Sequence, residues 1–283
     1  MSAESTSVSL ADRARHRLRT HVTEHPALYL PLARAKRALR LDVRDLQRQV
    51  ISSRTELVIE GYTRCGTTFA VYALQLAQET PVRLAHHWHA PAQLIEAARR
   101  KIPALLMIRR PDDAILSQLI REPSVPLQDA LVAYSRFYES LLAYPDSFVV
   151  GEFEHVTTDF APVIRRLNAR FGTSFAEFVH TEANVRECLE LIKLRGTFSR
   201  TLLGFESGEV SREQLAQELH SLGDRAGLLD AREGWDTRDA WVPSEDRTRA
   251  KTALREQLLH PSMARLRERA QHVYQAHVDR ATS

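Results

Sequence analysis

The sequence is poor in cysteine: only Cys65 and Cys188 occur in 283 residues. Two thiols cannot form a disulfide framework or a four-cysteine zinc site, so we expect a reducing compartment. The N-terminal stretch also lacks a continuous apolar run that could serve as a signal peptide or membrane anchor. We therefore predict a cytoplasmic protein without a transmembrane segment.

Neither sign of charge dominates the composition, because 39 Lys and Arg residues face 36 Asp and Glu residues, for a net charge of +3. This balance fits an anionic ligand but falls far short of the basic excess of nucleic-acid-binding proteins, so we predict no nucleic-acid partner. The 43% of hydrophobic residues can bury a full core, so we expect a folded chain. The sequence contains no internal repeat.

Strand and helix patterns alternate in the middle of the chain. An apolar run at 57–59 followed by Glu60 and Gly61 indicates a buried strand, and residues 67–78 have a helical pattern. A second strand at 104–108 precedes a helix that extends from Pro111 through Leu119. Two strand-to-helix units predict an α/β fold with a parallel sheet.

The same pattern continues towards the C-terminus with an amphipathic helix at 127–142 and a third strand candidate at 147–153. A helix at about 160–171, ended by Gly172, follows that strand. The predicted α/β core therefore spans about residues 56–175.

Helical extensions flank this core. Residues 10–50 predict two helices broken near Pro26 and Pro31, which pack as surface helices; a basic membrane-surface helix is the alternative. Residues 176–283 predict a mainly helical region. It contains a glycine-containing loop near 207–234 and a last long helix from Ser244 towards Val278. We expect one domain over residues 1–283.

The loop between the first predicted strand and helix has the glycine spacing of a phosphate-binding loop, with Gly61 and Gly66 separated by four residues. Thr67 stands where a nucleoside triphosphatase needs lysine, which disfavours a kinase or triphosphate hydrolase. Backbone N–H groups at a helix N-terminus bind phosphate oxygens, so no Mg²⁺ is needed. The predicted ligands are the Arg64 side chain, the N–H groups of Cys65, Gly66, Thr67 and Thr68, and both threonine hydroxyls.

This stretch resembles the phosphosulfate loop of the sulfotransferases that use 3′-phosphoadenosine 5′-phosphosulfate (PAPS), roughly (Y/F)-P-(K/R)-S-G-T-T-(W/F). Residues 62–69 here have the sequence YTRCGTTF. Thr63 replaces the usual proline and Cys65 the usual serine, and neither change removes a backbone donor. The resemblance implies a P-loop-type parallel sheet flanked by helices. It also implies transfer of a sulfuryl group from PAPS to a hydroxyl or amine of a small-molecule, sugar or lipid acceptor.

A second motif of that family holds the 3′-phosphate of PAPS by an arginine at a strand end and a serine eight residues later. Arg109 and Ser117 reproduce this spacing, and Arg110 competes with Arg109 for the role. The resemblance also places Phe153 near the adenine, where the family often has tyrosine, although Phe153 could equally belong to the core.

The family's general base lies in K-T-H-x-P, which residues 87–91 match as HWHAP. Histidine suits proton transfer near neutral pH, and His89 is our first choice. The loop length usual in the family favours His86 instead, so the assignment among His86, His87 and His89 stays open. We predict no metal site, because these histidines have no nearby carboxylate or cysteine and strand geometry would splay His86 from His87.

The sequence does not specify every part of the predicted site. The family's C-terminal 3′-phosphate loop is absent, and residues 195–197 or 247–251 are the possible substitutes. Trp88, Trp235 and Trp241 could line the acceptor pocket or the core. The alternatives to a sulfotransferase are a non-catalytic nucleotide-binding protein and, less favoured, a P-loop kinase. The acceptor and the oligomeric state are not specified by the sequence.

Overall fold

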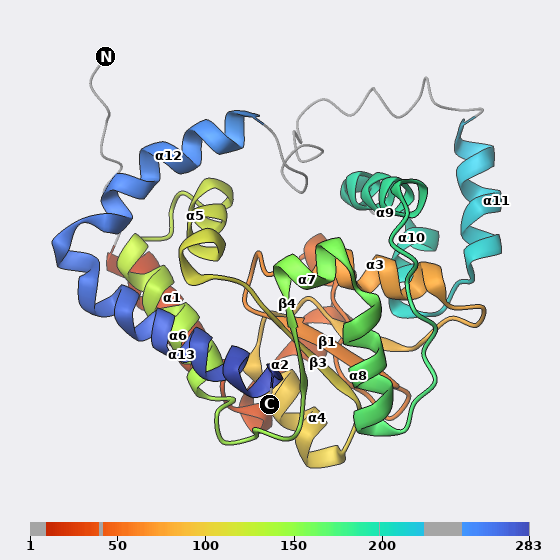
Figure 1. Ribbon diagram of the computed structural model, residues 1–283, viewed down its shortest axis with the longest axis horizontal. Helices are drawn as coiled ribbons and strands as arrows, with labels where there is room; N and C mark the ends of the chain where they lie inside the picture. Colours follow the sequence, from red (N-terminus) through yellow and green to blue (C-terminus); the bar gives the residue numbers. More distant parts are fainter. Residues whose placement is uncertain (1–9, 40–41, 198, 224–244, 283) are drawn as a thin grey trace.

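The protein is described here by a computed structural model that covers residues 10–39, 42–197, 199–223 and 245–282 (Figure 1). Its centre is a four-stranded sheet in which every strand pairs in parallel with its neighbours, in the order β2-β1-β3-β4. The strands are β1 Leu57–Gly61, β2 Leu84–His86, β3 Ala104–Ile108 and β4 Val149–Glu152. The fold is therefore α/β with helices flanking a parallel sheet, as the sequence predicts.

Continuous apolar runs explain the two central strands. All residues of β1 and β3 are buried, as expected for a parallel sheet covered on both faces. Strand β3 has its predicted bounds, and β1 contains the predicted apolar run and the two residues that follow it. The third predicted strand is shorter than expected: Glu152 takes the N-cap position of α7 (Phe153–Thr158), so Phe153 opens a helix. The three-residue strand β2 was not predicted.

The connections between strands bring the candidate residues to one edge of the sheet. They include α3 (Thr67–Ala77), α4 (Pro91–Arg100), α5 (Pro111–Arg121) and α6 (Leu127–Glu139). The chain steps from β1 to β2 and then back past β1 to β3. Right-handed crossovers in opposite directions place α3 and α4 on opposite faces. The loops after β1, β2 and β3 therefore meet at the carboxyl edge, beside the point where the strand order reverses.

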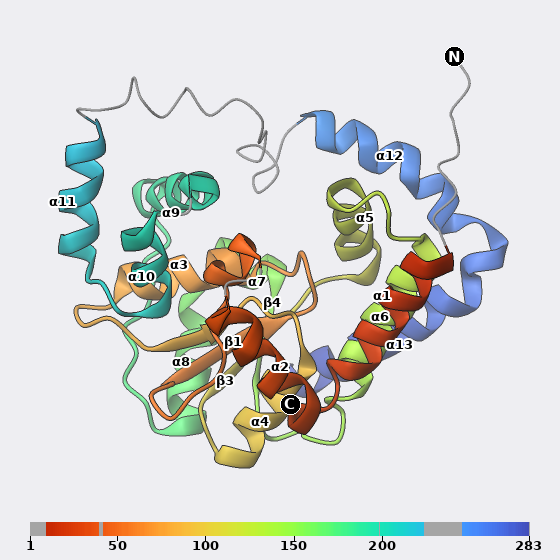
Figure 2. The same cartoon turned by 180° about the vertical axis from the view of Figure 1, so that it is seen from behind.

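The N-terminal region forms α1 (Leu10–Val22), α2 (Pro26–Ala38) and the 3₁₀ turn η1 (Val43–Gln47). The two predicted helices are confirmed, but Pro31 lies within α2 and does not break it. Its ring is exposed, and one proline near a helix start removes only one backbone hydrogen bond. Helix α1 packs on α6 and α2 on α4 (Figure 2).

The C-terminal region is mainly helical in its described part, as predicted. The predicted last helix is two helices, because Pro261 ends α12 and starts the 3₁₀ turn η4. Helix α11 occupies part of the predicted loop region, and residues 224–234 of that region lie outside the described residues. No described helix is long and apolar enough to cross a membrane. The helices from α8 onward are α8 Ala161–Phe171, α9 Glu182–Leu194, α10 Arg200–Ser207, α11 Arg212–Gly223, α12 Glu245–Leu259, η4 Pro261–Met263 and α13 Ala264–Thr282.

Candidate anion-binding and catalytic site

The loop of residues 61–68 joins β1 to α3 at the carboxyl edge of the sheet. Gly66 is the N-cap of α3, with a positive φ of 86°, and no side chain caps the helix. A Cβ at Gly66 would lie 2.9 Å from the ring of Phe153, so this position also has no room for a side chain. The N–H groups of the first turn of α3 lack partners within the helix and are available to an anion.

Arg64, Arg109 and Ser117 come together around this loop, although they belong to three different elements. The Nε of Arg64 donates a hydrogen bond to Ser117 Oγ at 3.0 Å. Arg109 Nη1 donates to the backbone oxygen of Arg64 at 3.2 Å. The structure thus places both predicted 3′-phosphate ligands beside the predicted 5′-phosphate ligand.

The geometry favours Arg109 over Arg110 as the anion ligand. The Arg109 guanidinium stacks 3.8 Å from the ring centre of Phe153, and Tyr134 donates from its hydroxyl to the Arg109 backbone oxygen at 2.6 Å. Arg110 is exposed and occupies the N-cap of α5. Phe153 therefore supports the arginine through its ring, a role that sequence reasoning did not assign.

Two buried polar atoms of this region are unsatisfied. Arg109 Nε and Thr67 Oγ1 have no hydrogen-bond partner among the described residues. A buried polar group without a partner is costly, and a charged one more so. A bound anion would offer both atoms an acceptor, so the residues present fit a phosphate-bearing ligand.

Cys65 points away from the loop face into the core. Its Sγ lies 3.2 Å from the hydroxyl of Tyr138, which itself donates to Met107 O at 2.9 Å. Burial raises the pKa of Cys65 to about 12, so the thiol is neutral at physiological pH. Only the backbone N–H of Cys65 can serve an anion. The side chain of Arg64 is instead held by Ser117, whose Oγ accepts the hydrogen bond from Arg64 Nε.

Among His86, His87 and His89, only His89 has a ring nitrogen, Nε2, for which the described residues provide no partner. Its backbone has a positive φ of 49° and its Nδ1 lies 2.9 Å from the backbone oxygen of Gly61. A carbonyl can only accept, so Nδ1 carries the proton and Nε2 presents a lone pair. The side chain is 26% exposed. Burial lowers the pKa of His89 to about 3, which keeps the ring neutral at pH 7.

Glu60 shapes the histidine segment and was missed by sequence reasoning. This fully buried carboxylate accepts hydrogen bonds from the backbone N–H groups of Trp88 and His89 and from Gln93 Nε2. Burial raises the pKa of Glu60 to about 7. The only indication of this role in the sequence is that an acidic residue follows the apolar run of β1.

His86 and His87 belong to a buried hydrogen-bonded chain. Their Nδ1 atoms lie 2.6 Å apart, and His86 Nε2 lies 3.2 Å from the backbone oxygen of Glu206. Because that oxygen only accepts, His86 donates from Nε2 and accepts at Nδ1. His87 therefore donates from Nδ1 and accepts at Nε2 from the Thr68 hydroxyl, 3.0 Å away. Burial lowers the pKa of both rings, which keeps them neutral.

Both features predicted to prevent a metal site at these histidines, splayed rings and the lack of a nearby carboxylate, are wrong. The two rings are not splayed apart, because β2 ends at His86 and His87 takes a positive φ of 64°. The side chain of Glu206 comes close from α10, 120 residues away in sequence, and the three could together hold a metal ion. Long-range contacts of this kind leave no local pattern in a sequence.

One oxygen of Glu206 is committed to other partners, whereas Oε2 is buried and has no hydrogen-bond partner among the described residues. Its Oε1 accepts hydrogen bonds from Arg195 Nε at 2.9 Å and from the Tyr72 hydroxyl, and both charged side chains are buried. Arg195 is thus held in an ion pair rather than presented to the loop. The other proposed substitute, residues 247–251, lies in α12, which packs against α5.

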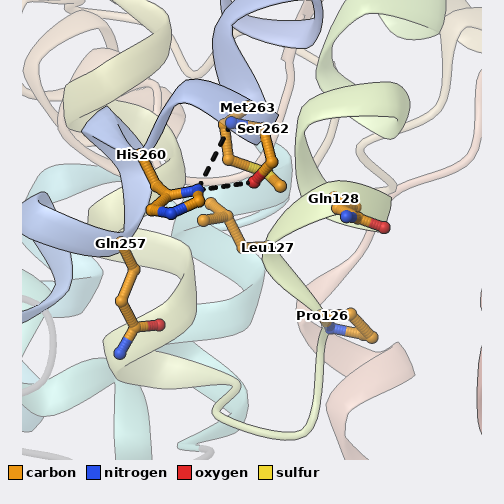
Figure 3. A pocket seen from close by; sticks show the side chains of 7 residues that line it. All are labelled: Pro126, Leu127, Gln128, Gln257, His260, Ser262 and Met263. Carbon is orange, nitrogen blue, oxygen red and sulfur yellow. Dashed lines mark hydrogen bonds between the residues drawn. The ribbon is translucent and has the colours of Figure 1, made fainter.

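The remaining predictions concern the acceptor pocket. Trp88 is only 2% exposed and packs edge-to-face on Tyr29, so it is a core residue. Trp235 and Trp241 lie outside the described residues. An open cavity of about 410 Å³ lies between the start of α6 and the α12–η4 junction (Figure 3), and it contains none of the predicted site residues. Its lining residues are Pro126, Leu127, Gln128, Gln257, His260, Ser262 and Met263.

No protein-family model matches the chain, and comparison with curated proteins and with solved structures gives no match either.

Proposed function

We propose that the protein is a sulfotransferase that moves a sulfuryl group from PAPS to a hydroxyl or amine of an acceptor. The observation that carries this proposal is the set of contacts around the loop 61–68. Arg109 and Ser117 bind the loop at Arg64, and His89 and His87 bind it at Gly61 and Thr68. Two anion-binding elements and a candidate base thus meet at one loop.

The proposed binding mode uses both arginines. Arg64 and the N–H groups of Cys65, Gly66, Thr67 and Thr68 would bind the 5′-phosphosulfate, because helix-terminal amides and guanidinium groups favour anions. Arg109 and Ser117 would bind the 3′-phosphate, which would offer an acceptor to the unsatisfied Arg109 Nε. The absence of a lysine at position 67 argues against a nucleoside triphosphate.

The proposed chemistry is an in-line displacement at sulfur. His89 Nε2 accepts the proton of the acceptor hydroxyl, the acceptor oxygen bonds to sulfur, and the bond from sulfur to the 5′-phosphate oxygen breaks. Arg64 and the loop amides stabilise the charge left on that oxygen. Adenosine 3′,5′-bisphosphate is the second product.

The tautomer of His89 supports its role as the base. Gly61 O fixes the proton on Nδ1, which leaves Nε2 able to accept one. The lowered pKa of the ring would rise when the negative charge of the co-substrate binds nearby, because an adjacent anion stabilises the imidazolium form. The base would thus gain proton affinity in the complex that reacts.

The test is incubation of the protein with PAPS and a panel of phenols, amines, sugars and lipids. We expect release of adenosine 3′,5′-bisphosphate that depends on one acceptor class and persists in excess EDTA. Tight bisphosphate binding without release for any acceptor would favour the non-catalytic alternative. Loss of activity on chelation, restored by zinc, would instead favour a metal held by His86, His87 and Glu206. Phosphate transfer from ATP would favour the kinase alternative.

A further inference from the structure

Helix α2 presents an apolar stripe to solvent. Leu28, Leu32 and Leu39 are 63%, 46% and 68% exposed. They stand at positions i, i+4 and i+11, which lie on one side of a helix, and we call them the α2 stripe. Leu39 is the C-cap of α2, so the stripe extends along the whole helix.

The opposite side of α2 already supplies the packing of the helix on the core. Pro26, Tyr29, Leu30 and Ala33 are buried there, and α2 contacts α4 through this side. The α2 stripe is therefore additional apolar surface that packing does not require. In Figure 2 the helix lies towards the viewer, with no other described element in front of it. Contiguous exposed apolar surface marks an interaction site.

Positive charge borders the α2 stripe. Helix α2 contains no acidic residue, and the exposed Arg34 and Lys36 stand on either side of the stripe. Residues 10–39 contain seven basic and two acidic residues, whereas the whole chain has 39 and 36. Of those two acidic residues, Glu24 is paired with Arg136. The excess positive charge of the protein is therefore concentrated in this segment.

The neighbouring surface extends the positive border. Arg34 donates to Ile51 O at 3.1 Å, and Arg100, in the last turn of α4, donates to Ser52 O at 2.8 Å. Both arginines thus lie along the loop beside α2. Arg54, in the same loop, is exposed.

We propose that α2 docks on an anionic lipid bilayer. A helix that lies in the membrane interface needs an apolar side that enters the acyl boundary and basic side chains that reach the headgroups. The α2 stripe supplies the apolar side. The basic side chains are those of Arg34, Lys36 and Arg100. The charge complementarity favours an anionic bilayer over a second copy of this basic surface. The proposal does not depend on the proposed chemistry.

The test is sedimentation of the full chain with vesicles of phosphatidylcholine alone or with about 30% phosphatidylserine, the anionic lipid of such surfaces. We expect the wild type to bind the anionic vesicles at least about tenfold more tightly than the neutral ones. Combined Leu28→Glu, Leu32→Glu and Leu39→Glu substitutions should abolish binding. Lys36→Ala should weaken it about fivefold, the contribution of one basic residue near the surface.

The matched control is Leu259→Glu, which changes an exposed leucine of α12 that is 52% accessible. This variant should bind as the wild type does, and thermal unfolding should show that all variants are folded. Equal sedimentation of the triple variant and the wild type would overturn the proposal. The proposal would also be overturned if the wild type does not bind vesicles but forms a dimer that the triple variant cannot form. A second copy of the chain would then cover the α2 stripe.

Discussion

Two polar clusters meet at the loop 61–68 and differ in the contacts that their side chains make. Around Arg64, Arg109 and Ser117, the contacts leave Arg109 Nε unsatisfied within the described chain, and Phe153 supports the guanidinium only through its ring. We call this group the arginine cluster. This arrangement leaves the Arg109 Nε donor available to a ligand.

The second group, the histidine cluster, contains His86, His87, Glu206, Arg195 and Tyr72. Its members hydrogen bond to one another in the core, and the chain of donors begins at the Thr68 hydroxyl and ends at the backbone oxygen of Glu206. Within it, Glu206 Oε2 has no partner among the described residues. Such an arrangement stabilises the fold and positions the loop. Polar residues around one loop thus have two roles: the arginine cluster is suited to bind a ligand, and the histidine cluster holds the loop in place. His89 belongs with the residues suited to the ligand.

The largest expected effect concerns His89. His89→Asn should lower turnover by about 10² to 10⁴, the contribution of a general base, and leave bisphosphate affinity nearly unchanged. Asparagine tolerates the positive φ at this position and can still donate to Gly61 O, so the variant removes the basic nitrogen with little change of backbone. His89→Ala should give the same loss. Steady-state kinetics and calorimetry measure the two quantities.

The opposite behaviour of His86 and His89 would contradict the distinction between the two clusters. If His86→Gln abolishes turnover in a folded protein while His89→Asn keeps it, the base belongs to the histidine cluster. Retention of turnover in both variants and in His87→Gln would place the base outside residues 86–89.

The next effect concerns the buried ion pair of the histidine cluster. Arg195→Ala should lower the free energy of unfolding by about 3–5 kcal/mol, because it leaves the Glu206 carboxylate buried and unpaired. Lys193→Ala is the matched control, since the exposed Lys193–Glu190 pair should contribute less than about 1 kcal/mol. Denaturant titration measures both. Similar losses for the two variants would contradict a structural role for Arg195.

A smaller effect is expected in the arginine cluster. Arg109→Ala should weaken the binding of adenosine 3′,5′-bisphosphate by about 1.5–3 kcal/mol, the contribution of a hydrogen bond to a charged group, with little loss of stability. Ser117→Ala should weaken it less. The matched control is Arg110→Ala, which changes the exposed neighbour. Calorimetry that shows an equal loss for Arg110→Ala would overturn the choice of Arg109.

The smallest effect is the dependence of stability on pH. Burial lowers the pKa of His86 from 6.5 to about 3, so below 6.5 the unfolded chain binds a proton that the folded chain excludes. Stability therefore falls as the pH decreases, by about 2 kcal/mol from this ring between pH 6.5 and 5. Glu60, with a raised pKa, acts in the opposite direction. His86→Gln should lose less stability than the wild type over this range in denaturant titrations.

Local sequence patterns predicted the framework of the site. The apolar runs of β1 and β3, the glycine spacing of the loop and the eight-residue separation of Arg109 and Ser117 all depend on neighbours in sequence. The same holds for Gly172, which ends α8 in a left-handed conformation. These elements could be placed because their determinants lie within a few residues.

The contacts that could not be predicted join distant segments. Glu206 reaches the histidines from α10, and Glu60 holds the turn at Trp88 and His89. Phe153 was placed in a strand, whereas it opens α7 and supports Arg109. Each of these contacts arises when helices and loops pack on the sheet, and no periodic pattern records that packing.

The most direct test of the account compares two nucleotides that differ only in the 3′-phosphate. Calorimetry should show that the wild type binds adenosine 3′,5′-bisphosphate at least about tenfold more tightly than 5′-AMP, because Arg109 and Ser117 each offer a donor to the additional phosphate. Equal affinity for the two nucleotides would contradict the assignment of the arginine cluster to the 3′-phosphate and, with it, the proposed use of PAPS.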